Sequence, residues 1–309
     1  MRFVWIGGGS IGLLHAGRFA LAGIPAALVV RSEQQRDRIL EDGLSLLLAE
    51  GERTAFLPCA QIDDAWFDEP PDWIALAVKQ THLSASLIGR LAEAMRSHPA
   101  AKLLCFQNGI GHVDKLAEHV PADRVYVAVS TEGARRLGMN RVEHTGVGTL
   151  QIGRWFDAHD RRDEAKIAVD HFRQAGFHTC VSNNIKEAVW KKLLINAAVN
   201  PLTAILRVPN GELLSSEAWI GVMRRLFEES RQIAHAEGVA VPESAWDELV
   251  EVCRRTAINR SSMLQDVESG RETEIEAING SLVRLARRHG IPAPLNETMA
   301  DLIRGMRLQ

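Results

Sequence analysis

The sequence has few of the residues and spacings that mark disulfide-bonded or metal-binding proteins. Its four cysteines are scattered, and no two of them have the C-x-x-C spacing. Such sparse cysteine usage is typical of a reducing compartment, and we expect a cytoplasmic protein with free thiols. The eleven histidines include no H-x-H or H-x-x-x-H pair. We therefore expect no metal site.

Long apolar runs and a charge excess are also missing. The longest apolar run after the N-terminus, residues 20–30, contains Gly23 and Pro25 and has about half of the roughly 20 residues that a membrane span needs. Glycines 7–9 interrupt the N-terminal apolar stretch too early for a signal peptide. With 36 basic and 39 acidic residues the net charge is -3, which gives nucleic acid or an anionic membrane no electrostatic attraction. We expect a soluble, unprocessed chain.

The chain has 309 residues, a length that suggests two domains at roughly 150 residues per domain. In the first half, short apolar runs alternate with helical periodicity. Near residues 141–153 the pattern changes to short, glycine-punctuated extended segments, which are typical of antiparallel edge strands that close the domain. This alternation predicts a parallel, doubly wound α/β sheet. The predicted strands are 3–6, 26–30, 73–78, 102–106 and 125–129, and the predicted helices are 10–21 and 83–95.

The second half has almost only helical periodicity. A boundary near Ser182-Asn183 therefore separates an α/β domain, 1–182, from an all-α domain, 183–309. Turn signals containing glycine and proline divide the helical segments. The predicted helices are 185–206, 211–237, 243–257, 262–268, 274–288 and 295–306.

A glycine-rich loop follows the first predicted strand and opens the first predicted helix. Residues 7–12 match G-x-G-x-x-G, and this position in a strand–loop–helix unit is the one used to bind a dinucleotide. Gly7 allows a tight turn, Gly9 lets the backbone approach a pyrophosphate, and Gly12 lets the helix pack on the sheet. Ser10 and Ile11 begin the helix, whose N-terminus attracts phosphate. The alternative is a glycine-rich turn without a ligand.

The residue at the end of the second strand indicates which dinucleotide binds. An acidic residue there would hold a ribose 2′-hydroxyl, whereas arginine accommodates a 2′-phosphate. The sequence has Arg31 at this position, followed by Arg36, so we predict NADP. Glu33 argues for NAD, because it could fold back onto a ribose, and Arg31 could also be an ordinary solvated surface residue.

A polar ladder lies in an apolar helical segment of the second half. Lys192, Asn196 and Asn200 recur every four residues and so share one helical face. Asparagine is a poor helix former, and its amide can both donate to and accept from hydroxyl and carboxylate groups. The ladder is thus either an exposed stripe or the wall of a polar pocket, and Asn200 could instead cap a helix beginning at Pro201. A partly desolvated lysine could protonate the alkoxide that forms when hydride adds to a ketone.

Together with these features, further motifs resemble the 2-dehydropantoate 2-reductase (ketopantoate reductase) family over nearly the whole chain. The matching segments are 7–12, 78–79, 106–111, 133–136, 144–146, 192–204, 209–213, 261–266 and 273–280. The resemblance implies a Rossmann domain followed by a helical domain of the 6-phosphogluconate dehydrogenase C-terminal type. It also implies NADPH-dependent reduction of 2-dehydropantoate to (R)-pantoate, a step of pantothenate and coenzyme A synthesis.

The same resemblance implies residue roles. Lys192 matches the general acid and Glu274 an acidic residue beside it. Lys79, which follows a predicted strand and so lies at the ligand-binding edge of the sheet, matches a cofactor contact, as does Asn108. Substrate contacts are matched by Asn196, Asn200, Asn210 and Ser262.

Several of these residues also have a purely structural interpretation. Asn108 and Asn210 could be ordinary turn residues. Ser262 could cap the following helix, with Gln265 completing a capping box, and Glu274 could be a first-turn helix carboxylate.

Two other functions fit the same motifs. One is a related NADP-dependent reductase of a different 2-oxo acid, in which the lysine ladder is kept and the pocket rim differs. The other is a non-catalytic NADP sensor, since a fold alone does not fix a function. A homodimer through the apolar C-terminal helices is possible in each case.

Overall fold

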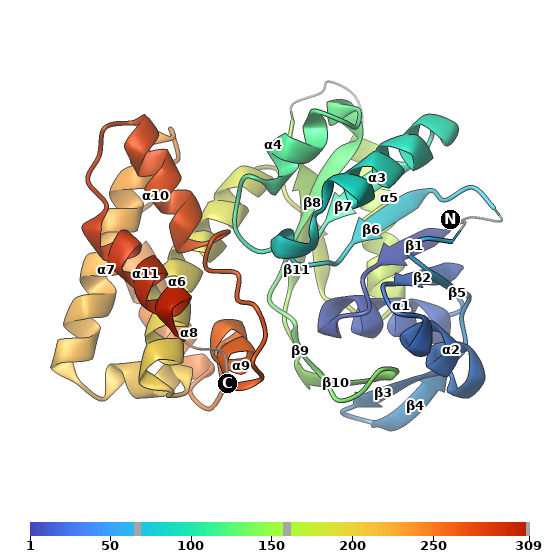
Figure 1. Cartoon of the computed structure of the whole chain (residues 1–309), viewed down its shortest axis with the longest axis horizontal. Coiled ribbons are helices and arrows are strands. Elements are labelled where there is room, and N and C mark those ends of the chain that lie inside the picture. The colour runs from blue at the N-terminus through green and yellow to red at the C-terminus, as the bar shows by residue number, and fades with distance from the viewer. Residues whose placement is uncertain (65–68, 157–161, 307–309) are drawn as a thin grey trace. The chain divides into compact units, whose positions relative to one another are not determined.

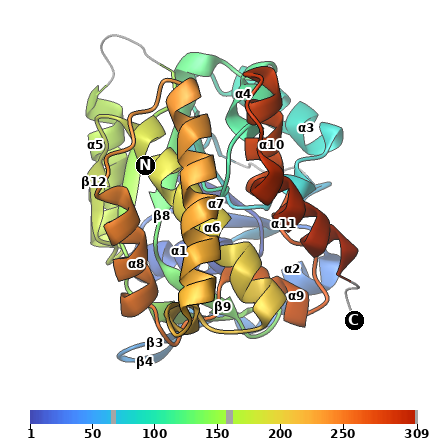
Figure 2. The same cartoon turned by 90° about the vertical axis from the view of Figure 1, so that its left-hand side faces the viewer.

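The chain forms two units, shown in Figures 1 and 2. The computed structural model describes residues 1–64, 69–156 and 162–306. The first unit consists of Met1–Gln107 and His112–Ile185. The second consists of Lys186–Gln309 and a short excursion of the N-terminal half, Asn108–Gly111.

An eight-stranded sheet forms the centre of the first unit (Figure 1). Neighbouring strands are parallel from β5 through β2, β1, β6 and β7 to β8, whereas β11 runs antiparallel to β8. The chain order reverses between β1 and β6, which is where open α/β sheets bind ligands. The strands in spatial order are β12 (Thr179–Val181), β11 (Leu150–Arg154), β8 (Val125–Ser130), β7 (Lys102–Cys105), β6 (Trp73–Leu76), β1 (Phe3–Ile6), β2 (Ala26–Val30) and β5 (Cys59–Gln61).

Helices cover this sheet because alternate strand residues are apolar on both faces. On one face, Phe3 of β1 contacts Phe19, with ring centroids 4.7 Å apart, and Trp5 contacts Phe172 at 5.9 Å. These contacts bury α1 (Ser10–Leu21) and α5 (Arg162–Gln174). The remaining helical elements of the unit are α2 (Glu33–Asp42), η1 (Gln80–His82), α3 (Ala85–Ser97), α4 (His112–Ala117) and η2 (Ala122–Arg124).

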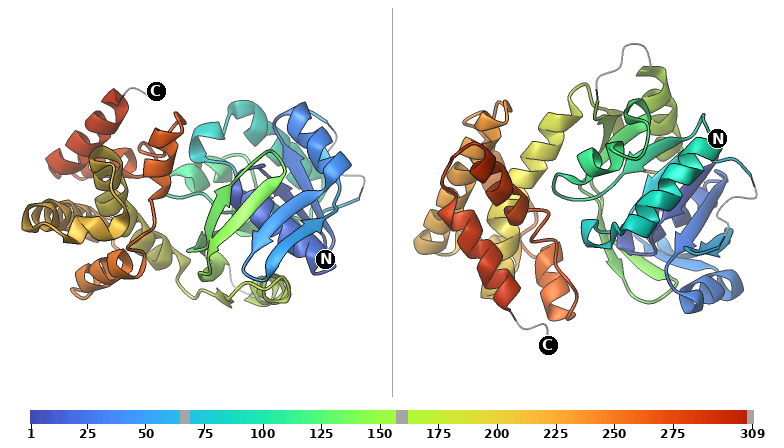
Figure 3. Two further views of the ribbon diagram at one scale, coloured as in Figure 1. Left: turned by 90° about the horizontal axis from the view of Figure 1, so that it is seen from below. Right: turned by 45° about the horizontal axis from the view of Figure 1, so that its top comes forward.

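A second sheet packs against α1, and Figure 3 (left) shows it most clearly. A Cβ added to Gly17 of α1 would lie 2.6 Å from Leu46 Cδ1, so this glycine permits the close packing. The antiparallel expectation for residues 141–153 holds for β11 in the main sheet, but β10 joins the second sheet, parallel to β3 and antiparallel to β9. The strands are β4 (Gly51–Ala55), β3 (Leu44–Leu48), β10 (Arg141–Gly146) and β9 (Gly133–Arg136).

The second unit is built of helices, as predicted (Figure 2). Leu194, Ala198 and Leu202 of α6 pack with apolar side chains of α7 and α8 in one buried cluster. Across the described ranges, no helix is both long and apolar enough to cross a membrane. The elements are α6 (Ile185–Leu206), η3 (Asn210–Leu214), α7 (Glu217–Ala236), α8 (Ala245–Arg255), α9 (Ser262–Glu268), α10 (Asn279–Arg288) and α11 (Pro294–Gly305).

Two predicted helices begin later than expected. The segment predicted from residue 211 begins with η3, and α7 starts only at Glu217. The segment predicted from Glu274 is a turn up to Ile278, since Gly280 N donates to Ile275 O, five residues back, at 2.9 Å. The interpretation of Glu274 as a first-turn helix carboxylate is therefore wrong.

Candidate active site

The glycine loop joins β1 to α1 at the carboxyl edge of the sheet. Gly7 has φ +124° and donates its N–H to Val29 O at 2.8 Å, a conformation that favours glycine. A Cβ on Gly12 would lie 1.9 Å from Gly7 O, whereas a Cβ on Gly9 would meet none of the described residues within 4 Å beyond its chain neighbours. The first turn of α1 has no side-chain cap and no acidic residue. The fold itself therefore requires glycine at positions 7 and 12. The open side of Gly9, together with the helix N-terminus, suits a pyrophosphate.

Residues from outside the motif hold this loop in place. The Arg136 backbone N–H donates to Ser10 Oγ at 3.1 Å, and Arg136 Nη1 donates to Gly8 O at 3.2 Å. Gln35 Nε2 donates to Gly8 O at 3.0 Å and to Met139 O at 2.7 Å. Sequence reasoning gave Gln35 and Arg136 no role. The only signal was that Arg136 ends the motif at 133–136.

Arg31 directly follows β2 and is exposed. Glu33, the residue that argues for NAD, accepts from Arg36 Nη2 at 3.0 Å, and Arg36 also pairs with Asp37 and Asp64. Arg31 makes no ion pair with any described residue. Among the described residues, Arg31 is therefore a cation directly after β2 that is available to a phosphate, while Glu33 and Arg36 neutralise each other.

Lys79 lies at the same edge of the sheet, between β6 and η1, and is half-buried. Its neighbour Val78 packs against the glycine loop, since a Cβ on Gly7 would lie 3.0 Å from Val78 Cγ1. The ends of β1, β2 and β6 thus carry Gly7–Gly12, Arg31 and Lys79 at the point where the strand order reverses. This is the arrangement expected for a dinucleotide site.

In the second unit, the polar ladder lies on α6. Lys192 and Asn196 are half-buried, and Asn200 is buried with 6% exposure. Burial lowers the pKa of the Lys192 ammonium to about 8, although the charge of Glu274 acts to raise it. The ladder is not a solvated stripe, because Asn200 lies in the interior and the lysine is desolvated.

Glu274 links the Lys192 helix to the loop that carries Asn108. Its side chain is buried with 7% exposure, and Oε2 accepts from Asn108 Nδ2 at 2.9 Å. The loop that carries Asn108 packs on the Glu274 turn, with Ile110 N donating to Ala277 O at 3.3 Å. Gly109 has φ +80°, and a Cβ there would lie 2.1 Å from Ala277 O. Asn108, Lys192 and Glu274 are therefore in one cluster, although 166 residues separate the first from the last.

Asn210 is held at the start of η3. Its Nδ2 donates to Thr256 Oγ1 at 3.0 Å, and its backbone N–H donates to Asn259 O at 2.9 Å. The buried Oδ1 has no hydrogen-bond partner among the residues that the structure describes, which leaves an acceptor available for a ligand.

Ser262 is exposed at the first position of α9. The cap of this helix is Ser261, whose Oγ accepts from Leu264 N at 3.0 Å and from Thr203 Oγ1 at 2.7 Å. Gln265 Nε2 donates to Arg260 O instead of completing a capping box. The capping interpretation of Ser262 is wrong by one residue, and its hydroxyl is not used to end the helix.

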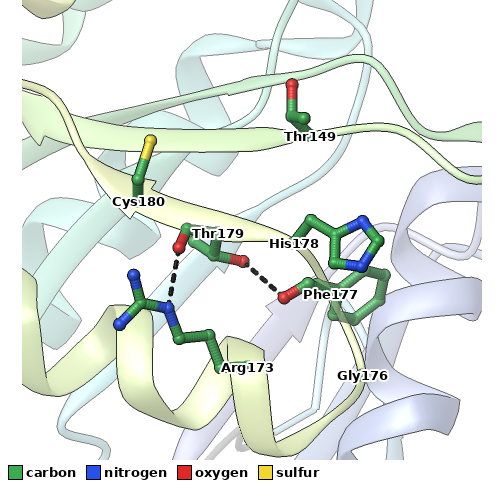
Figure 4. A pocket seen from close by; sticks show the side chains of 7 residues that line it. All are labelled: Thr149, Arg173, Gly176, Phe177, His178, Thr179 and Cys180. Atoms are coloured by element: carbon green, nitrogen blue, oxygen red, sulfur yellow. Dashed lines mark hydrogen bonds between the residues drawn. The ribbon is translucent and has the colours of Figure 1, made fainter.

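A pocket of about 600 Å³ in the first unit contains none of the predicted site residues. Figure 4 shows it beside β12, with Arg173 Nε donating to Thr179 O at 2.8 Å. It lies at the end of the strand order farthest from β2 and β5. In the part of the chain that the structure describes, no three His, Cys, Asp or Glu side chains are grouped to hold a metal ion.

Comparison with known proteins decides the family. The model described as "Ketopantoate reductase PanE/ApbA" matches residues 3–156, and "Ketopantoate reductase PanE/ApbA C terminal" matches residues 184–307. The chain belongs to the ketopantoate reductase family. It is 36% identical over 306 residues to the 2-dehydropantoate 2-reductase of Halobacterium salinarum, with 98% of each chain covered. It is 33% identical to that of Bacillus subtilis, covering 95% of this chain and 93% of the relative.

Solved structures agree with this family assignment. A crystal structure of a probable 2-dehydropantoate 2-reductase from Bacillus subtilis has TM-score 0.84 at 31% identity and covers 99% of this chain and 100% of its own. A ternary structure of D-mandelate dehydrogenase with NADH and anilino(oxo)acetate has TM-score 0.88, covering 99% and 98%, at 23% identity. The second likeness shows the shared fold alone. Ketopantoate reductases are oxidoreductases that use a nicotinamide dinucleotide, and the family assignment confirms a Rossmann-like domain followed by a helical one.

Proposed function

We propose that the protein is an NADPH-dependent 2-dehydropantoate 2-reductase, which converts 2-dehydropantoate, NADPH and a proton to (R)-pantoate and NADP⁺. It would supply pantoate for pantothenate and coenzyme A synthesis. The observation that carries the proposal is the desolvated Lys192, with a pKa of about 8, beside Glu274 and Asn108. The names of the full-length relatives support the same substrate.

The cofactor would bind at the edge where β1, β2 and β6 end, and residues 1–182 would form its domain. The open side of Gly9 and the N-terminus at Ser10 and Ile11 suit the pyrophosphate. Arg31 suits a 2′-phosphate, since Glu33 is paired with Arg36. NADPH, once bound, supplies the hydride that adds to C2 of the substrate. Lys79 and Asn108 would contact its nicotinamide half.

Residues of 183–309 would bind and protonate the substrate. Lys192 has the properties of a general acid: a pKa of about 8 keeps it mostly protonated at neutral pH while allowing easy proton transfer to the C2 oxygen. Glu274 would keep the lysine charged before transfer. The amides of Asn196, Asn200 and Asn210 and the hydroxyl of Ser262 would bind the substrate hydroxyl and carboxylate, in a site that the helical domain (183–309) supplies.

The decisive experiment follows NADPH oxidation with ketopantoate beside analogues that lack the 4-hydroxyl or alter the branch. If the asparagine amides recognise that hydroxyl, ketopantoate should exceed the deoxy analogue in kcat/KM by about 10⁴. If the protein prefers another 2-oxo acid, it is a related reductase with a different substrate. Tight NADPH binding with no turnover on any 2-oxo acid would indicate a sensor.

A further inference from the structure

Helix α6 carries a proline in its interior, one residue after Asn200. Proline has no backbone N–H, so the carbonyl four residues earlier loses its helical partner. At Pro201 that carbonyl belongs to Ala197, which lies between Asn196 and Asn200 and is fully buried. A buried carbonyl without a donor costs roughly 1–3 kcal/mol, so the helix that bears the ladder needs a donor from elsewhere at this point.

Asn279 supplies that donor. It is the first residue of α10 and fully buried, and its Nδ2 donates to Ala197 O at 3.0 Å. The same amide donates to Asn296 Oδ1 at 3.0 Å. Asn296 in turn donates to Glu229 Oε1 at 2.9 Å and to Ser230 Oγ at 3.1 Å. The donor is therefore oriented by buried and half-buried side chains of α7 and α11, which favours a single side-chain position.

Asn279 also ends the turn that carries Glu274. Ala277 N and Ile278 N both donate to Glu274 O, at 3.0 and 3.1 Å. The hydrogen bond to Ala197 thus joins the Glu274 turn to α6 between two members of the polar ladder. The charge of Glu274 raises the pKa of Lys192, so the distance between these two groups matters. That distance depends on the hydrogen bond between Asn279 and Ala197.

We propose that Asn279 is a positioning residue for the reaction: it compensates the hydrogen bond that Pro201 removes and thereby holds the Glu274 turn against the helix of Lys192, Asn196 and Asn200. The expected effect on kcat rests on the proposed function, whereas the hydrogen bond that compensates for Pro201 does not. Asn279 touches neither substrate nor cofactor in this proposal. It acts through the geometry of groups that do.

The test is a double-mutant cycle with Pro201. Asn279→Ala removes the donor, and we expect kcat with ketopantoate to fall at least about tenfold, as misplaced catalytic groups do, with the Kd of NADPH unchanged. Pro201→Ala returns an N–H that can reach Ala197 O within the helix. In that background Asn279→Ala should lower kcat less than about threefold, a coupling that independent sites do not show.

Ser230→Ala is the matched control, because it removes a hydrogen bond of the same network that involves neither Asn279 nor a residue of α6, while Asn296 keeps its hydrogen bond to Glu229. It should lower the melting temperature, leave kcat near that of the native protein and show no coupling to Pro201→Ala. Equal losses of kcat from Asn279→Ala with and without Pro201 would overturn the proposal. If Asn279→Ala alone does not fold, the double variant should, and its failure to fold would count against the proposal equally.

Thermal unfolding of the native protein, the two single variants at Asn279 and Pro201, and their double variant separates this inference from the proposed function. Coupling between Pro201 and Asn279 in the melting temperature needs no substrate. If the native protein reduces a different 2-oxo acid, the kcat cycle is run on that acid. Coupling without ketopantoate turnover would support the inference and contradict the proposed substrate. An active ketopantoate reductase without coupling would support the proposed substrate and contradict the inference.

Discussion

The candidate site residues divide into a backbone half in the first unit and a side-chain half in the second unit. At the glycine loop the chemistry comes from backbone and from missing side chains: Gly12 permits contact with Gly7, and Gly9 leaves open space. In the helical unit it comes from side chains, with Lys192, Glu274 and Asn108 gathered from three distant segments. The backbone half consists of consecutive residues and can be recognised in the sequence. The side-chain half forms only when distant segments pack together, and this packing also sets the pKa of the lysine.

The largest expected effect is in the side-chain half. Lys192→Ala should lower kcat by about 10²–10⁴, the range for loss of a general acid, because no proton donor remains at the C2 oxygen. The Kd of NADPH, measured by fluorescence titration, should stay within about twofold, since the loop is unchanged. Lys191→Ala is the matched control: this neighbour is exposed and paired with Glu248. Equal losses from both variants, or an unchanged kcat in Lys192→Ala, would remove the lysine from the mechanism.

In the backbone half, two glycines should respond in opposite ways. Gly12→Ala forces a Cβ to within 1.9 Å of Gly7 O, so we expect at least about 1–3 kcal/mol of destabilisation from overpacking. The Cβ of Gly9→Ala meets no atom of the described residues within 4 Å apart from its chain neighbours, so the substitution should leave the melting temperature unchanged. It should still weaken NADPH binding by about tenfold or more, because the methyl group enters the space for the pyrophosphate. Thermal unfolding and NADPH titration of both variants check this. A stable Gly12→Ala, or a Gly9→Ala that binds NADPH normally, would contradict the division of roles.

The same contrast explains what the sequence could predict. The strand–helix alternation, the glycine loop and the spacing of Lys192, Asn196 and Asn200 are local patterns, and the structure has each of them. The second sheet was not predicted, because β3 finds its parallel partner β10 about a hundred residues later, in the register Leu46 to Val142. No local periodicity encodes such a pairing.

Errors at single residues have the same origin. Ser261 and Ser262 have equal capping propensity, and Ser261 caps α9 because its hydroxyl also accepts from the buried Thr203. The helix predicted from Glu274 begins only at Asn279, whose side chain donates to Ala197 O of α6. In both places a tertiary hydrogen bond decides where a helix begins, and propensity alone does not contain it.

A smaller effect tests the cofactor preference at the end of β2. Arg31→Ala should lower kcat/KM for NADPH about 10–100-fold, the equivalent of one charged hydrogen-bonding partner, and leave kcat/KM for NADH nearly unchanged. Arg36→Ala should affect the two cofactors equally, since Arg36 is engaged by Glu33, Asp37 and Asp64. Steady-state kinetics with both cofactors provide the comparison. Native protein that uses NADH as well as NADPH would refute the assignment of Arg31 to a 2′-phosphate.

The smallest expected effect lies within the helical unit and concerns how packing sets a pKa. With the pKa of Lys192 at about 8, kcat/KM should fall as pH rises through that value, because the proton to be donated is lost. Glu274 raises this pKa, so Glu274→Gln should lower it and move the basic limb of the pH profile to lower pH.

The variant amide in Glu274→Gln keeps an oxygen that can accept from Asn108 Nδ2, so the loop need not move. Glu276→Gln is the control, because this nearby carboxylate is exposed and paired with Arg304 and Arg284. Its removal should leave the basic limb in place. A limb that moves to higher pH in Glu274→Gln would contradict the charge effect of Glu274 on Lys192. A limb that stays fixed would show that burial alone sets the acidity of the lysine. The side-chain half of the site would then depend on packing but not on the charge that packing brings beside Lys192.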